Sequence, residues 1–72
     1  MKDSRNIIKE GTIKEALPDT TFRVVFDDNS EALAKLSGKM RFYKIKILVG
    51  DKVKVEFTPY DEKRGRIIYR TK

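Results

Sequence analysis

Four cations and two adjacent aromatic residues are concentrated in the middle of the chain, within residues 37–48. They are Lys39, Arg41, Phe42, Tyr43, Lys44 and Lys46. An unpaired charge is very costly to bury, so the four cations must face water or an anion. Unpaired bases stack on aromatic rings and phosphates attract cations, so the segment predicts a nucleic-acid-binding surface. Met40, in the same segment, either contacts the ligand or anchors the segment on the rest of the fold.

Two further groups of candidate binding residues lie outside this segment. One is Arg23, and the other is a C-terminal set made of Tyr60, Lys63, Arg64, Arg66 and Arg70. We expect the three groups to converge on one rim of the molecule. Because Phe42 and Tyr43 are neighbours, in an extended segment one ring faces inward and the other outward. Tyr69 is expected to place its ring in the core and its hydroxyl at the edge.

The sequence offers no groups for catalysis or metal binding. It contains neither cysteine nor histidine, which removes thiolate ligands, the commonest metal ligand and the usual general base near neutral pH. Two pairs of acids, at 27–28 and 61–62, lie in polar connecting segments, where turn formation explains them better than acid–base chemistry. The four glycines are scattered singly and form no phosphate-binding loop. We therefore expect a protein that is not an enzyme and that holds no metal or cofactor.

The composition limits the chain to one small domain that favours anionic partners. Its 72 residues allow a single core, so we expect one domain over residues 1–72. With 17 Lys and Arg against 11 Asp and Glu, the net charge is +6, which favours polyanions, although a solvated surface explains the same excess. Residues 1–6 are polar and are expected to fray. No segment has the apolar core of a signal peptide or the length of a membrane span, so we expect a cytoplasmic protein.

Five segments alternate apolar and polar residues as β-strands do. They cover residues 7–17, 21–26, 31–36, 52–57 and 66–70. Gly11 is expected to bend the first strand, and Ser37 to cap a short helical turn after the third. The residues expected to face the core are Ile13, Phe22, Val24, Phe26, Ala32, Ala34, Leu36, Val53, Val55 and Phe57. Five strands with a short helical turn between the third and fourth predict an all-β, five-stranded OB-fold barrel, with an SH3-like barrel as the alternative.

Three motifs carry a resemblance to a known family. They are Ser-Gly-Lys-Met-Arg at 37–41, Gly-Asp-Lys-Val at 50–53, and a C-terminal segment from Tyr60 to Arg70 that contains Tyr-Asp and Gly-Arg-Ile. Together with the order and length of the chain, they closely resemble bacterial-type translation initiation factor one. The residues that match the family's loop and its basic positions are Lys39, Met40, Arg41, Lys46, Arg64, Arg66 and Arg70.

The resemblance implies a non-enzymatic OB-fold factor that binds the decoding, or A-site, region of the small ribosomal subunit. It implies contacts with ribosomal RNA and a ribosomal protein, and action with the other two initiation factors in start-codon selection. We expect the protein to be a monomer when free. Two other classes stay open: a general single-stranded nucleic-acid binder or RNA chaperone, and a protein-interaction module with an SH3-like barrel. Against the protein-interaction module, the sequence lacks the tryptophan and the aromatic groove that bind proline-rich peptides.

Overall fold

The computed structural model describes residues 6–71, apart from the side chain of Glu62. The chain forms strands β1 (Ile7–Leu17), β2 (Thr21–Phe26) and β3 (Glu31–Leu36), helix α1 (Gly38–Phe42), and strands β4 (Lys52–Thr58) and β5 (Asp61–Arg70). Of the segment expected to fray, residues 1–5 lie outside the described residues, while Asn6 donates a hydrogen bond of 2.9 Å to Oε2 of Glu56. Within the described residues, no helix has both the length and the apolar character needed to span a membrane.

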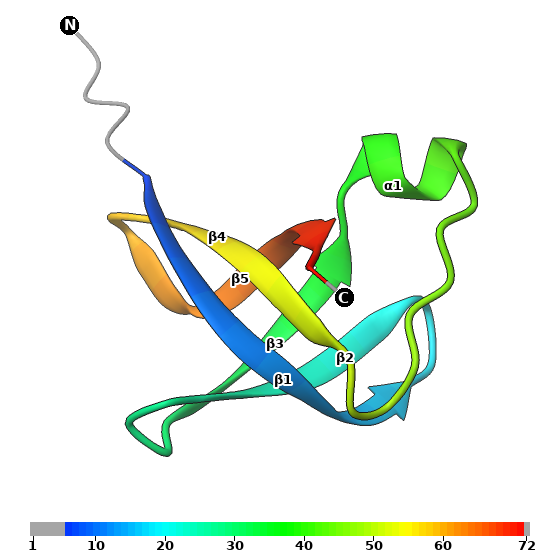
Figure 1. Cartoon of the computed structure of the whole chain (residues 1–72). Coiled ribbons are helices and arrows are strands. Elements are labelled where there is room, and N and C mark those ends of the chain that lie inside the picture. Colours follow the sequence, from blue (N-terminus) through cyan, green and yellow to red (C-terminus); the bar gives the residue numbers. More distant parts are fainter. Residues whose placement is uncertain (1–5, 72) are drawn as a thin grey trace, which may run out of the picture.

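The five strands close into a barrel in the order β1-β2-β3-β5-β4 (Figure 1). All neighbouring strands are antiparallel except β3 and β5, which run parallel. Helix α1 connects β3 to the segment that leads into β4, and it stands at one end of the barrel (Figure 1). This arrangement is the predicted OB-fold, and the chain does not adopt the alternative SH3-like barrel.

The long strand β1 pairs with both β2 and β4, and Gly11 lets the side chain of Val24 approach the β1 backbone closely. A Cβ atom at this position would lie 2.6 Å from Cγ1 of Val24, so glycine is the residue that fits. The glycine pairs with β2 on one edge and with β4 on the other. A bulge follows at Lys14, where the register with β2 shifts, and it leaves Lys14 and Glu15 both exposed.

The barrel interior holds a single hydrophobic core. The most completely buried side chains belong to Ile13, Val24, Val53, Val55 and Ile67. The residues predicted to face the core are all buried, except Leu36, which is half-buried and packs against it. Burying each large apolar side chain contributes about 1.5–3 kcal/mol. The core also includes Met40 and Ile47, so it extends from the barrel to α1 and the segment that follows it.

The last strand is longer than its alternation predicts. Strand β5 begins at Asp61 rather than Arg66, and only two residues separate it from β4. Polar residues such as those at 61–64 are typical of a connecting segment. In the structure, however, the Asp61, Lys63 and Arg64 side chains are exposed, and the backbone pairs with β4 and then with β3. Because the described side chains at the start of β5 face solvent, this part of the strand forms without an alternation of apolar and polar residues.

Candidate nucleic-acid interface

Helix α1 begins at a capped residue that is tied to the barrel. The Oγ of Ser37 accepts a hydrogen bond of 3.2 Å from the backbone amide of Met40, which confirms the predicted cap. The amide of Ser37 donates a hydrogen bond of 3.0 Å to the carbonyl of Ile67 on β5. The helix ends before Lys44, whose φ of 56° lies in the left-handed region. A helix this short is not stable alone, so these contacts hold it in place.

Buried residues before and after Lys44 fix α1 and the following segment to the barrel. The side chain of Met40 is 3% exposed and belongs to the core. Met40 is therefore the anchor of α1, and its contact with a ligand stays a prediction. Ile47 is also buried, and Oδ2 of Asp51 accepts a hydrogen bond of 2.9 Å from the amide of Leu48. The return to β4 then turns at Gly50, whose φ of 97° suits glycine.

A first cation-lined hollow lies over β3 and β5 and has a volume of about 640 Å³. We call it the β3–β5 groove, and its basic residues are Lys35, Arg41, Arg64 and Arg66. The strand register explains the cluster, because Lys35 lies opposite Arg66 and Leu33 lies opposite Arg64 in the parallel pair. Helix α1 contributes Arg41 to the lining of the same groove. Three predicted binding residues thus come together, and none of the groove's described lining residues is aromatic.

A second hollow, of about 480 Å³, borders a different face of α1 and the end of β5. We call it the C-terminal groove, and it is lined by Lys39, Met40, Tyr43, Ile45, Lys46, Ile68, Tyr69 and Arg70. Nη1 of Arg70 donates a hydrogen bond of 2.9 Å to the carbonyl of Lys46 and lies 3.7 Å from Oδ2 of Asp51. These contacts orient the guanidinium and tie β5 to the segment after α1. The C-terminal groove contains five of the predicted binding residues.

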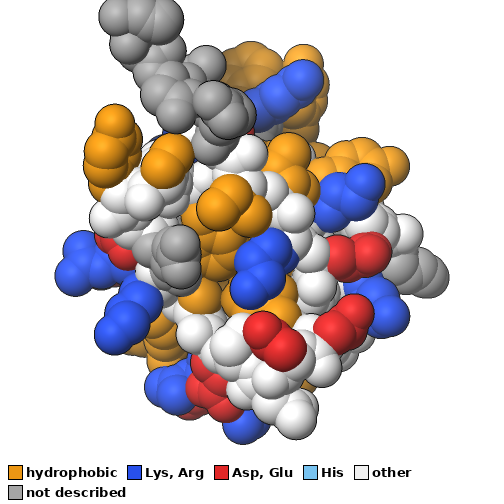
Figure 2. Space-filling model, turned by 90° about the vertical axis from the view of Figure 1, so that its left-hand side faces the viewer, with side chains coloured by type: hydrophobic (Ala, Val, Ile, Leu, Met, Phe, Trp, Pro, Cys, Tyr) orange, Lys and Arg blue, Asp and Glu red, His pale blue; other side chains and the backbone are white. Residues whose placement is uncertain are grey.

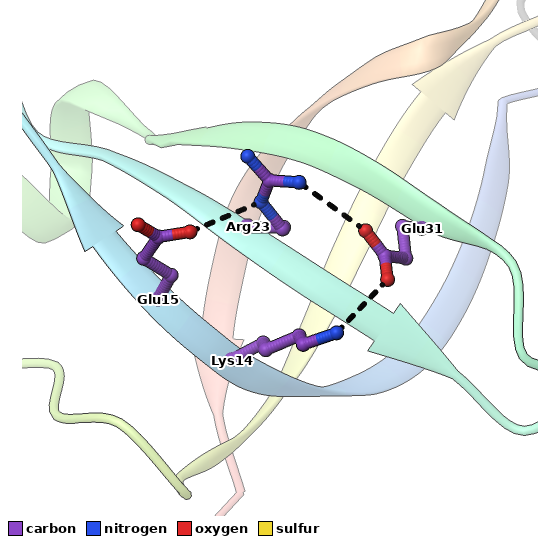
Figure 3. Close-up of polar contacts among 4 residues, drawn as sticks. All are labelled: Lys14, Glu15, Arg23 and Glu31. Carbon is purple, nitrogen blue, oxygen red and sulfur yellow. Dashed lines mark hydrogen bonds and ion pairs between the residues drawn. The ribbon is translucent and has the colours of Figure 1, made fainter.

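Arg23 lies on the outer surface of β2 in a network of four charges (Figure 3). Its Nε lies 3.3 Å from Oε1 of Glu15, and its Nη1 lies 3.5 Å from Oε1 of Glu31. The other carboxylate oxygen of Glu31 lies 3.2 Å from Nζ of Lys14. The hydrogen bond from Lys14 is the main cause that lowers the pKa of Glu31 below its ordinary value. Two acids balance two cations here, so Arg23 offers a phosphate little net charge.

Arg66 is also paired, whereas most cations around α1 are not. Nη2 of Arg66 lies 2.9 Å from Oε1 of Glu56 on β4. Hydrogen bonds from Asn6 and from Arg66 hold the pKa of Glu56 below its ordinary value. In the described part of the chain, no ion pair is formed by Lys35, Lys39, Arg41, Lys44, Lys46 or Arg64. These six side chains carry the charge of the region that no described carboxylate compensates.

The exposed aromatic residues do not all lie at the grooves. Phe42 and Tyr43 are 77% and 63% exposed, and their ring centroids are 5.1 Å apart in an edge-to-face arrangement. The prediction that one of them faces inward is wrong, because they end a helix in which Met40 already makes the buried contact. Tyr60 is 87% exposed at the turn between β4 and β5. Phe42, Lys44 and Tyr60 are not among the described lining residues of either groove.

The structure brings together only part of the predicted set. Lys63 lies with Arg23 at a third hollow over β2, β3 and β5, beside the β3–β5 groove. The groove residues that were not predicted to bind include Leu33, Lys35 and Tyr69. The alternation of buried alanines in β3 places the first two on the outside, so the sequence does contain a signal for them. Tyr69 is exposed rather than placed in the core, because a bulge in β5 turns it outward.

The side of the barrel away from α1 has a mixed surface. Figure 2 shows hydrophobic side chains at the centre of this face, with both basic and acidic side chains around them. The hollow next to the turn between β2 and β3 is lined by apolar residues, and its two lysines, Lys9 and Lys63, are balanced by the carboxylates of Asp28 and Glu31. This hollow offers a polyanion no net positive charge, so we place the candidate interface at α1 and the two grooves beside it.

A closed OB-fold barrel with a projecting, cation-flanked helix belongs to the class of small nucleic-acid-binding modules. No cluster of three or more potential metal-binding side chains occurs within the part of the chain that the structure describes. The family model described as Translation initiation factor 1A / IF-1 matches residues 2–72. The chain belongs to this family and is a translation initiation factor.

Two solved structures resemble the chain along nearly its whole length. The solution structure of translation initiation factor one from the Wolbachia endosymbiont strain TRS of Brugia malayi is 43% identical, with a TM-score of 0.79, and the match covers 93% of this chain and 79% of that one. The crystal structure of YjeQ from Thermotoga maritima is 27% identical, with a TM-score of 0.72, over 92% of this chain and 23% of that one. The second match is therefore to one part of a longer protein.

Proposed function

We propose that this initiation factor binds the decoding, or A-site, region of the small ribosomal subunit through ribosomal RNA. The observation that carries the proposal is α1, a five-residue helix fixed to the barrel, with cation-lined grooves on two of its faces. A projecting element with cations on both sides suits a site enclosed by phosphate backbone. Membership of an initiation-factor family supports the ribosome as the partner.

Affinity in this proposal comes mainly from phosphate contacts. The cations that lack a carboxylate partner within the described chain are the first candidates, and they are Lys39, Arg41, Lys44, Lys46 and Arg64. Arg66 and Arg70 keep partners on the protein, which fix their guanidinium groups for directional hydrogen bonds. Arg23 contributes least, because Glu15 and Glu31 already neutralise it.

Site selection comes from the fixed shape of the α1 region. The Ser37 cap and the buried Met40 side chain hold the helix before any ligand arrives, so binding orders little additional structure. Phe42 and Tyr43 project from the end of the helix, where they can meet bases or a ribosomal protein. A monomer seated there would occupy the A-site and, with the other initiation factors, assist start-codon selection in the cytoplasm.

The test is cosedimentation of the purified protein with isolated small subunits at physiological salt. Large subunits and a free RNA oligonucleotide serve as controls, and chemical footprinting of the subunit RNA locates the site. We expect saturable binding near one protein per small subunit, with protection confined to the decoding region. Equal binding to all three partners, or protection elsewhere, would contradict the proposal.

A general single-stranded nucleic-acid binder is the second candidate function. The observation that favours it is the spread of exposed rings, Phe42, Tyr60 and Tyr69, over separate parts of the surface rather than in one pocket. Scattered rings beside cations can stack bases without selecting a site. Equal affinity for the oligonucleotide and the small subunit in the same experiment would favour this function.

A further inference from the structure

Tyr69 lies on the outer surface of β5 because of a β-bulge at Ile68. Side chains alternate along a regular strand, so two residues after the buried Ile67 the tyrosine ring would enter the core. Instead Val55 pairs with Ile67 while Lys54 pairs with Tyr69, which makes Ile68 the extra residue. The bulge reverses the alternation, and Tyr69 is 57% exposed.

The surroundings of the Tyr69 ring are basic. Nζ of Lys54, from the paired position on β4, lies over one face of the ring, 5.7 Å from its centroid, which leaves the opposite face as the one for a base. The ring also borders the C-terminal groove, together with Lys39, Lys46 and Arg70. The phenol hydroxyl makes no hydrogen bond with any residue in the described part of the chain. A large, mostly apolar ring is thus held in water next to four cations.

The two grooves beside α1 differ in the chemistry they offer. The β3–β5 groove presents cations around the aliphatic Leu33, and none of its described lining residues is aromatic. It can meet phosphates but offers a base no ring to stack on. The C-terminal groove presents Tyr43 and Tyr69 as well as cations. Rings and cations together form the combination that binds unpaired nucleotides, because every base has a face that can stack.

We propose that Tyr69 is a stacking site for one unpaired nucleobase, and that Lys54 and Lys46 contact the phosphates on either side of it. The proposal rests on the proposed function in one respect, namely that the chain binds RNA. It deepens that function by dividing the interface into a groove for the phosphate backbone and a groove for a base. The ligand class of the C-terminal groove is therefore an unpaired nucleotide within a single strand.

The test compares two single-stranded RNAs of about eight nucleotides, within the usual range for one OB-fold. One is an oligouridine, and the other has the same backbone but carries abasic sites. The wild-type chain should bind the oligouridine more tightly. Tyr69→Leu should weaken binding of the oligouridine by about 5- to 150-fold, the usual range for loss of one stacked base, and leave the abasic strand unaffected. Tyr69→Phe should bind as the wild type does.

Two control variants separate stacking from charge and from a general surface effect. Arg64→Gln, in the β3–β5 groove, should weaken both strands by the same factor, because it removes a phosphate contact. Leu48→Ala shortens a side chain that is as exposed as Tyr69 and borders neither groove, so it should change neither affinity. Thermal unfolding of each variant shows whether the barrel is intact.

A second readout does not depend on removing the ring. The chain contains no tryptophan, so Tyr69→Trp introduces a single indole, whose fluorescence can be excited selectively beside the remaining tyrosines. Its fluorescence should be quenched by the oligouridine and not by the abasic strand. Equal wild-type affinity for both strands, an equal loss on both in Tyr69→Leu, or equal quenching would each overturn the stacking site. A base preference without cosedimentation on small subunits would leave stacking in place and contradict the ribosomal function instead.

Discussion

Arg66 and Glu56 face each other across the β4–β5 pair, with Nη2 of the arginine 2.9 Å from Oε1 of the glutamate. The contact holds one cation of the β3–β5 groove in a fixed orientation, and it also places a carboxylate at the edge of a surface that we propose binds phosphate. Part of the positive charge of the groove is therefore already neutralised in the free protein.

Replacing Glu56 with glutamine should strengthen binding to the small subunit. The change frees Arg66 for a phosphate and removes a repelling charge, so affinity should rise and its dependence on salt should become steeper, by up to about 0.7 log units per log unit of salt. Binding of Glu56→Gln is measured over a salt series beside Asp27→Asn, which makes the same change in net charge in the turn between β2 and β3. An equal gain in both variants would show that only net charge matters.

Stability should fall in acid through three carboxyl groups. The pKa is lowered in Asp28 mainly by a hydrogen bond from Ser30, in Glu31 by one from Lys14, and in Glu56 by one from Asn6. A pKa that folding lowers means that the ionised form stabilises the fold, fully above the ordinary values of 3.8 and 4.5 and decreasingly as pH falls through the lower folded values.

The measurement for this prediction is denaturant unfolding from about pH 7 to about pH 3, in the range where carboxyl groups titrate. These groups should add no pH dependence above about pH 5.5 and should cause a progressive loss below the ordinary values. With no histidine in the sequence, no transition is expected near pH 6.5. Glu31→Gln should flatten the acid limb, and an unchanged acid limb in this variant would contradict the assignment.

Arg41 and Arg23 should differ in their effect on binding, although both were predicted to contact RNA. Arg41→Gln removes a charge that has no carboxylate partner within the described chain, so affinity should fall and the salt dependence should drop by about 0.7 log units per log unit of salt. Arg23→Gln should have a smaller effect, because Glu15 and Glu31 already neutralise that charge. Both salt series use cosedimentation with small subunits, and equal losses would show that the network in Figure 3 opens on binding.

Two glycines should respond in opposite directions to substitution by alanine. At Gly65 a Cβ atom would collide with Cγ1 of Val55 and lie 2.9 Å from Cε1 of Phe57, so Gly65→Ala should lower the free energy of unfolding by about 1–3 kcal/mol. At Gly38 the Cβ atom would meet nothing within 4 Å, so Gly38→Ala should raise it by about 0.4–1 kcal/mol. Urea unfolding measures both changes. A neutral Gly65→Ala would contradict this prediction, because it would mean that the side chains of Val55 and Phe57 shift without cost.

The barrel could be predicted from sequence wherever one face of a strand is apolar. In β4, valines at positions 53 and 55 alternate with lysines, and the structure buries the valines and exposes the lysines. The cap at Ser37 was also predictable, because serine before a short helical segment has one common use. These features depend on residues close together in the chain, which the alternation and the turn residues record directly.

The features that were not predictable depend on closure of the barrel. The bulges at Lys14 and Ile68 adjust strand length to fit neighbours on both sides, and nothing local marks them. Each bulge reverses the alternation after it, which is why Tyr69 is exposed. Strand β5 begins at Asp61, opposite Thr58 of β4, and from Arg64 it pairs with β3, whose residues lie far earlier in the chain. Ion pairs such as that of Arg23 depend on the same distant neighbours.

The parallel pairing of β3 with β5 also has a consequence for folding during synthesis of the protein. Strand β5 follows every other strand in the chain, and it supplies residues to both grooves. The barrel cannot close, and neither groove can form, until β5 has emerged from the ribosome that is synthesising it. Pairing between such distant segments is also slow, typically taking milliseconds to seconds in β-rich domains. A nascent chain whose β5 is still inside the ribosome therefore lacks both grooves, and under the proposed function it cannot yet bind a small subunit through them.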